Sequence, residues 1–412
     1  MKAILNRLSH LFSLEKLTPG FRRFSLMHCL FLVFISVQGF FMNTLLIRIT
    51  GDNTIVSIYN MGTWIVSAIF MIVAVFVIKK TSLKFTFPFS ILMFILLNIF
   101  FLMFMNELDK YLYVIVFFNA AGGGFYWIGF SIAINDYNQG GSKPVALAWV
   151  GAIATAVNVL MPALAGFGIS AFDGIKGYYV VFGLSLVFAV MTVITALTLP
   201  KTKQKNKETY FKKALKGCFK NKILSYVMLG EFSRAIREGA FMFLLNILLF
   251  NLVTNESVVG INTFLCSAIT FFAQWSSARI ITRYKYSKIM NFSIVSLTVA
   301  TSMIIFNYSP LTIILLSIIN GFFSVYIYNP TLTIFYNGVM AADSDNKISF
   351  EIYSLRECLI ALGRSLGLIV VFIMPKTPLG YAMAMIILTL SQFFTSFFMT
   401  RADKLMSLEA DL

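Results

Sequence analysis

Long apolar stretches of about 20 residues recur twelve times along the chain, separated by short polar segments. An α-helix needs about 20 apolar residues to cross a bilayer. The pattern therefore predicts twelve membrane-spanning helices, at 25–47, 54–78, 85–105, 111–135, 145–169, 178–199, 223–252, 258–280, 289–307, 311–337, 349–373 and 379–400. No stretch shows the ten-residue alternation typical of a membrane β-barrel. The predicted class is an all-α integral membrane protein with both termini on one side.

One polar segment, 200–222, differs from the others because it holds nine lysines and one glutamate. It divides the predicted helices into two sets of six. Within it, YFKKALKGCF is predicted to form a short amphipathic helix on the membrane surface. The predicted organisation is a lead-in at 1–24, a first bundle at 25–199, a basic linker at 200–222, a second bundle at 223–400 and a tail at 401–412.

Composition and charge agree with this class. The 412 residues are 58% hydrophobic and 12% charged, whereas a soluble domain has about 25% charged residues. The net charge of +16 would suit nucleic acid, but the lysines and arginines are unevenly distributed. Only four of the 33 fall on one predicted side of the membrane: Arg48, Lys110, Lys176 and Lys376. This asymmetry indicates cytoplasmic termini in a cell membrane and no nucleic-acid partner.

A weak internal repeat supports two related halves. At an offset of 201 residues, 118–137 aligns with 319–338, so that Asn119 matches Asn320 and Trp127 matches Tyr328. The four cysteines show no CxxC spacing, and there are only two histidines. We therefore expect no metal site.

The helix count, the two halves and the basic central segment together resemble the major facilitator superfamily. That family has a G-x-L-x-D-R-x-G-R-[RK] motif after its second helix. In VFVIKKTSLK (75–84), Lys80 and Lys84 fit the basic positions, and Lys79 stands where the family has Asp. A second, degenerate copy is ARIITRYKYSK (278–288), and MPALAG (161–166) is similar to the G-P-x-x-G-G signature of the family's antiporters. The resemblance implies transport by alternating access, and the antiporter signature favours export.

Charged residues inside two predicted spans are the strongest candidates for function, because each costs at least about 2.5–3.5 kcal/mol in a bilayer. In the seventh span, Glu231, Arg234, Arg237 and Glu238 share one helical face. In the eleventh, Arg356, Glu357 and Arg364 share another, and Glu351 lies near the span's end. We expect the two sets to pair, for instance Arg234 or Arg237 with Glu357. Four acids and four arginines could make a neutral network.

This network has two interpretations. It could pin the two helices together, or its deeper members Glu238, Arg237 and Arg364 could line a substrate cavity. In the second case a glutamate beside an arginine couples protons to transport, or the arginines bind an anion.

The first half, by contrast, has few charges within its predicted spans. Asp136, at the end of the fourth span, is a second candidate for proton coupling. The predicted cavity-lining residues of the two halves are Gln38, Asn43, Asn119, Tyr126, Trp127, Tyr326, Tyr328 and Asn329. The glycines of AAGGG (120–124) predict close packing or local unwinding, and Asn329–Pro330 predicts a matching break in the second half.

The leading hypothesis is proton-coupled export of an amphipathic compound by a secondary active transporter. The alternatives are a flippase for a lipid or a lipid-linked anionic headgroup, uptake of a small organic anion, and a transport-inactive membrane scaffold or sensor. No P-loop or hydrolase motif is present in the sequence, so we do not expect an enzyme. We expect a monomer without a cofactor, driven by the proton gradient, whose partners are the bilayer and a small-molecule or lipid substrate.

Overall fold

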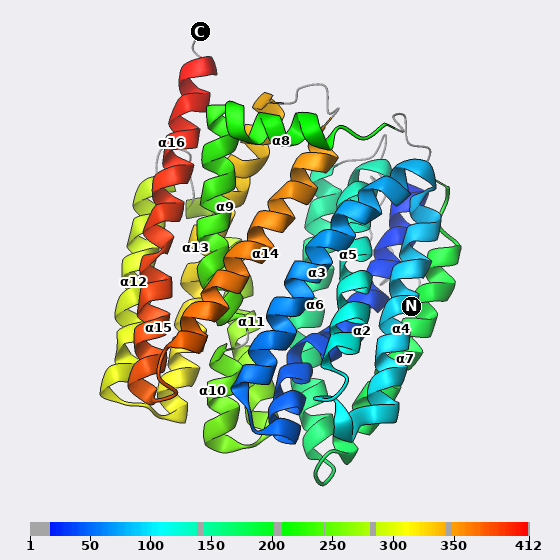
Figure 1. Cartoon of the computed structure of the whole chain (residues 1–412), viewed down its shortest axis with the longest axis vertical. Helices are drawn as coiled ribbons and strands as arrows, with labels where there is room; N and C mark the ends of the chain where they lie inside the picture. Colours follow the sequence, from blue (N-terminus) through cyan, green and yellow to red (C-terminus); the bar gives the residue numbers. More distant parts are fainter. Residues whose placement is uncertain are drawn as a thin grey trace, which may run out of the picture.

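The computed structural model describes residues 17–137, 143–201, 208–242, 244–280, 286–342 and 348–410. These residues form helices joined by short turns and contain no strand (Figure 1). The helix ends follow ordinary capping rules. For example, Thr18 caps α2 with Pro19 at the first helical position, and Gly51, with φ of 66°, ends it.

The first half consists of α2 to α7. Its helices are α2 (Pro19–Thr50), α3 (Asn53–Lys80), α4 (Leu83–Phe104), α5 (Leu112–Asp136), α6 (Lys143–Ser170) and α7 (Lys176–Leu197), with the short 3-10 helix η2 (Met105–Glu107) after α4. The linker contains α8 (Phe211–Lys220), which confirms the predicted short helix. It lies across the ends of α9 and α14 (Figure 1), and we call this end of the molecule the α8 side.

The second half consists of α9 to α16. Its helices are α9 (Lys222–Phe241), α10 (Leu244–Val253), α11 (Glu256–Ile280), α12 (Tyr286–Phe306), α13 (Pro310–Ala342), α14 (Ser349–Ile373), α15 (Pro378–Leu390) and α16 (Gln392–Ala410). The seventh and twelfth predicted spans are therefore each divided into two helices. The segment predicted as a tail, 401–412, is helical as far as Ala410.

The glycine-rich stretch of α5 packs closely and does not unwind. A Cβ on Gly122 would lie 2.8 Å from the Phe94 ring, and one on Gly124 would lie 2.6 Å from Phe70. These glycines let α5 approach α4 and α3. The predicted break at Asn329–Pro330 is wrong as well, since α13 is one helix with Pro330 inside it.

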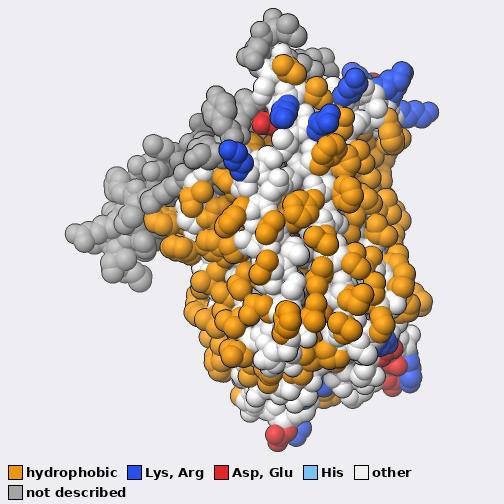
Figure 2. All heavy atoms as spheres, turned by 90° about the vertical axis from the view of Figure 1, so that its left-hand side faces the viewer, with side chains coloured by type: hydrophobic (Ala, Val, Ile, Leu, Met, Phe, Trp, Pro, Cys, Tyr) orange, Lys and Arg blue, Asp and Glu red, His pale blue; other side chains and the backbone are white. Residues whose placement is uncertain are grey.

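Within the described residues, eleven helical segments are long and apolar enough to span a membrane with at most two charged residues in the spanning window. The twelfth is α14, whose 25 residues include the four charged residues already noted. Hydrophobic side chains cover the middle of the molecule, and Lys and Arg gather toward one end (Figure 2). The predicted all-α membrane fold is confirmed.

The two halves meet along α3 and α14, which lie side by side (Figure 1). Near the middle of this seam, the Cys358 sulfur lies 3.9 Å from the carbonyl oxygen of Ala68. On its other flank α14 packs against α9 of its own half. The charged helix is thus placed between the rest of the second half and the first half.

Candidate functional site

Close packing of α9 on α14 brings their charged faces together. A Cβ on Gly363 would lie 2.6 Å from the carbonyl oxygen of Phe232, and Gly239 and Gly367 approach the partner backbone closer still. Larger side chains at these positions would push the two helices apart. The small residues therefore set the distance at which side chains from the two helices can pair.

The charged residues of α9 and α14 form a cluster linked by ion pairs. Within α9, Arg234 contacts Glu231 at 2.9 Å and also pairs with Glu238. Between the helices, Arg356 lies 3.0 Å from Glu231, and Arg364 lies 2.5 Å from Glu238. Glu357 pairs with its neighbour Arg356 at 2.8 Å. The predicted pairing of the two sets is present, but its partners differ from the predicted Arg234 or Arg237 with Glu357.

Glu351 does not belong to this cluster. Its buried carboxylate pairs with Lys79 of α3 at 2.5 Å, and it also accepts a hydrogen bond from the backbone N–H of Tyr210. Among the described residues, the ion pairs of the cluster therefore link three arginines with three glutamates, and the predicted network of four acids and four arginines is not formed. Among the described residues, no carboxylate pairs with Arg237, whose charge is left uncompensated.

Neutral groups surround Arg237, which is 5% exposed. Its guanidinium donates to Asn320 Oδ1 at 2.6 Å, to Thr389 Oγ1 at 3.2 Å and to Ser324 Oγ at 3.5 Å. It lies 3.8 Å from the centroid of the Phe241 ring. Such contacts hold the cation in position without neutralising it.

A cavity of ≈ 340 Å³ lies beside this cluster, within the second half. Its charged lining residues are Arg234, Arg237 and Glu238. The remaining lining residues are Phe241, Met242, Cys266, Thr270, Gln274, Asn320, Gly321, Ser324, Val325, Ile327, Tyr328 and Gln392. Phe241 ends α9 and Gln392 begins α16, so both interrupted helices contribute to the cavity at their breaks.

Of the residues predicted from the sequence, Arg234, Arg237, Glu238 and Tyr328 line the cavity. Glu231 is fully buried, and Arg356 binds it, so these two lie deeper between α9 and α14. Asn329 donates to Gln274 and Ser277 beside the cavity, and Tyr326 is buried against Ser276. Gln274, Asn320 and Gln392 were not among the site residues predicted from the sequence, although Asn320 lies in the internal repeat.

The predicted polar residues of the first half do not line this cavity. Tyr126 is fully buried and hydrogen-bonds to His28 at 2.8 Å, so it belongs to the core of its bundle. Asn119 donates to the Tyr59 hydroxyl at 2.7 Å.

The other first-half candidates are also outside the cavity. Asn43 accepts from Asn60 at 2.9 Å, and Trp127 packs against neighbouring aromatic rings. Gln38 is buried, and its amide has no hydrogen-bond partner among the described residues. The side chain of Asp136 lies outside the described residues.

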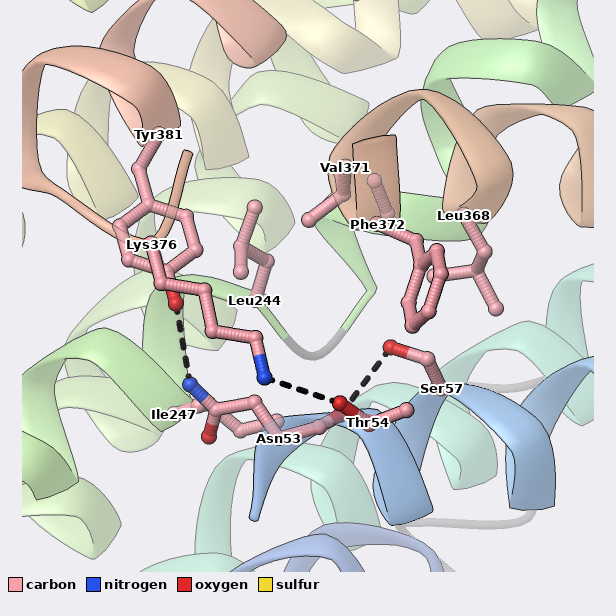
Figure 3. A pocket seen from close by; sticks show the side chains of 11 residues that line it. Asn53, Thr54, Ser57, Leu244, Ile247, Leu368, Val371, Phe372, Lys376 and Tyr381 are labelled. Carbon is pink, nitrogen blue, oxygen red and sulfur yellow. Dashed lines mark hydrogen bonds between the residues drawn. The ribbon is translucent and has the colours of Figure 1, made fainter. Parts of the chain in front are cut away.

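Polar contacts join the two halves at the end away from α8. Lys376 donates to Thr54 at 3.0 Å, and Asn53 donates to the Tyr381 hydroxyl at 3.1 Å, around a small pocket of ≈ 30 Å³ (Figure 3). The Thr54 backbone N–H, together with its hydroxyl and Lys376, holds the pKa of Asp52 below its usual value.

Deeper at the same end, Glu256 of α11 binds residues of the first half. It pairs with Arg48 and accepts from Tyr178 at 3.0 Å. Nearby, α6 and α11 touch through glycines, since a Cβ on Gly166 would lie 3.2 Å from the Cα of Gly260 and 2.8 Å from the Glu256 carbonyl oxygen. The halves are therefore in close contact at this end.

On the α8 side, the Lys79–Glu351 pair joins α3 to α14. Lys79 also donates to the backbone carbonyl of Glu208 at 2.8 Å, and Phe211 at the start of α8 packs on Phe76 of α3. Residues of the linker thus contact Lys79 and α3 beside this ion pair, and the halves are in contact at both ends.

Comparison with known proteins decides the family. The family model described as Major Facilitator Superfamily matches residues 24–348. The chain belongs to the Major Facilitator Superfamily. The members of this superfamily are transporters, so the chain is a multi-pass membrane transporter.

Relatives of this superfamily member agree with its fold. It is similar to the uncharacterized protein YqgE of Bacillus subtilis (strain 168), with 23% identity, covering 81% of this chain and 78% of that protein. A bacterial homologue of the iron transporter ferroportin in an inward-facing state has a TM-score of 0.68 at 13% identity, covering 93% and 98% of the two chains. The nucleoside transporter NupG has a TM-score of 0.65 at 12% identity, covering 93% and 99%.

Proposed function

We propose that this member of the superfamily is a secondary active transporter that exports an amphipathic compound in exchange for protons. Transport would proceed by alternating access, with the second-half cavity as the substrate site. The protein would act as a monomer in the cell membrane, with cytoplasmic termini, no cofactor and the proton gradient as its energy source.

The observation that carries this proposal is the position of Glu238. Its side chain is 27% exposed, lines the cavity and is held between Arg234 and Arg364. Arg364 in turn lies 5.6 Å from the Trp64 ring of α3, which belongs to the first half. Protonation of Glu238 would remove its charge and release Arg364, so a proton in the cavity can alter the contact between the halves.

The cavity lining supports an amphipathic substrate. Aromatic and aliphatic side chains, including Phe241, Met242 and Ile327, form one part of the wall, and Thr270 and Gln274 supply polar groups. Small-molecule sites commonly have this mixture, with volumes of roughly 300–1,000 Å³. Export is supported by the resemblance of MPALAG (161–166) to the signature of the family's antiporters.

Proteoliposomes test the proposal with two probes of opposite charge, octanesulfonate and octyltrimethylammonium. A pH gradient is expected to drive flux of at least one probe in the native protein. Glu238→Gln is expected to abolish that flux while leaving equilibrium binding of the probe intact. Glu107→Gln, at an exposed surface pair with Lys110, is the matched control. Undiminished gradient-driven flux in Glu238→Gln would refute Glu238 as the coupling residue.

A further inference from the structure

Arg237 differs from the other three arginines of the charged cluster. Arg234, Arg356 and Arg364 each pair with at least one glutamate, whereas Arg237 has only neutral hydrogen-bond partners among the described residues. An isolated charge removed from water is strongly unfavourable. Packing alone gives no reason to keep a cation here, since an apolar side chain would fill the same space.

The guanidinium of Arg237 has unused donors. It carries five N–H groups, of which the contacts to Thr389, Ser324 and Asn320 use three, one on each nitrogen. Among the described residues, one N–H on each terminal nitrogen has no acceptor, and two N–H groups of a guanidinium can together contact the oxygens of an anion. Because Arg237 lines the cavity, a bound molecule can reach these groups.

The charge of the cavity wall also selects for an anion. Among the described residues that line the cavity, Glu238 is the one carboxylate, and two arginines already pair with it. The cavity therefore presents a single uncompensated positive charge beside the apolar side chains of Phe241, Met242 and Val325. A cationic substrate would meet repulsion here, and a neutral one would leave the charge of Arg237 unpaired.

We propose that Arg237 binds the anionic head group of an organic monoanion whose apolar body lies against Phe241 and Met242. Sulfonate, carboxylate and phosphate monoester groups share the required chemistry. This inference rests on the proposed transport function and names the class of its substrate. An inside-negative membrane potential would also favour outward movement of such an anion.

Equilibrium binding to the full-length protein in nanodiscs tests the inference, with three probes that share an octyl chain: octanesulfonate, octanol and octyltrimethylammonium. Octanesulfonate is expected to bind most tightly. Arg237→Gln is expected to weaken it by at least about tenfold while leaving octanol binding unchanged, and Arg237→Lys is expected to weaken it less. Arg401→Gln on α16, which removes an exposed arginine, is the control and is expected to bind octanesulfonate like the native protein.

The outcomes separate this inference from the proposed function. Equal binding of octanol and octanesulfonate, or full octanesulfonate binding by a folded Arg237→Gln variant, would overturn the anion site and leave amphipathic transport standing. Preferential binding of octyltrimethylammonium would do the same. If none of the probes bound the native protein, both the anion site and the amphipathic substrate class would be rejected. Octyl phosphate and octanoate, measured afterwards, distinguish which anionic head group binds most tightly.

Discussion

Glu231 holds α9 and α14 together, and its replacement provides the sharpest test of the structural role of the cluster. The carboxylate is fully buried and lies 2.9 Å from Arg234 and 3.0 Å from Arg356. At an effective dielectric constant of about 20, each contact corresponds to an attraction of about 5–6 kcal/mol before desolvation is subtracted. Glu231→Gln keeps the shape of the side chain but leaves two buried arginines with less compensation. Removal of one partner from a buried pair costs about 3–5 kcal/mol.

The assay is equilibrium unfolding of the purified protein in mixed detergent micelles. Glu231→Gln is expected to lower the free energy of unfolding by about 3–5 kcal/mol, and the exposed-site control Glu107→Gln is expected to leave it unchanged. In a double-mutant cycle, Arg356→Gln added to Glu231→Gln is expected to cost less than the two single changes together, because the second substitution removes a charge that the first left unpaired. A loss below about 1 kcal/mol, typical of a surface pair, would refute this role for Glu231.

Two further predictions concern the contacts between the halves. Lys79→Glu is expected to weaken the contact on the α8 side and to raise the labelling of cavity residues from that side. Lys79→Glu combined with Glu351→Lys is expected to restore native labelling. If the double variant did not recover native labelling, the ion pair would not be the cause. Gly166→Val places side-chain atoms against α11, where even a Cβ would lie 2.8 Å from the Glu256 carbonyl oxygen, so it is expected to separate the halves at the opposite end and increase labelling from there. Native labelling of Gly166→Val would show that this close contact does not control access.

The sequence predicted the features that depend on one helix at a time. Apolar length is sufficient to locate the spans, and the angular step of an α-helix is sufficient to place Arg234 between Glu231 and Glu238. The break between α9 and α10 was missed because apolar residues lie on both sides of it, and the break between α15 and α16 was missed because only Ser391 and Gln392 interrupt the apolar run there. No proline marks either break. Length and hydrophobicity do not distinguish one span from two helices in line.

Features that depend on which helices are neighbours could not be predicted from the sequence. Glu351 was placed near the end of the eleventh span and counted among the four acids of the network, but contact between α3 and α14 pairs it with Lys79. Without Glu351, the charged residues of α9 and α14 include one more arginine than glutamates. Arg237 has no carboxylate partner among the described residues, which is the basis of the proposed anion site. Similarly, Gln392 joins the cavity only because α16 packs on α9, where its amide donates to the Ser233 and Arg234 carbonyl oxygens at 3.2 and 3.3 Å.

In transport by alternating access, the second-half cavity opens to each side of the membrane in turn. Cys266 lines this cavity, so its reactivity from each side reports where the cavity is open. In a variant with Cys29, Cys218 and Cys358 replaced by alanine, a membrane-impermeant thiol reagent is added to one face of oriented proteoliposomes at a time. Added cysteines at exposed positions mark the two faces: Phe219→Cys the α8 side and Glu107→Cys the opposite side.

We expect Cys266 to react from both faces, each marker to react from one face only, and octanesulfonate to protect Cys266 from labelling. Labelling of Cys266 from a single face under all conditions, with both markers behaving as expected, would contradict alternating access. That result would favour the transport-inactive scaffold instead.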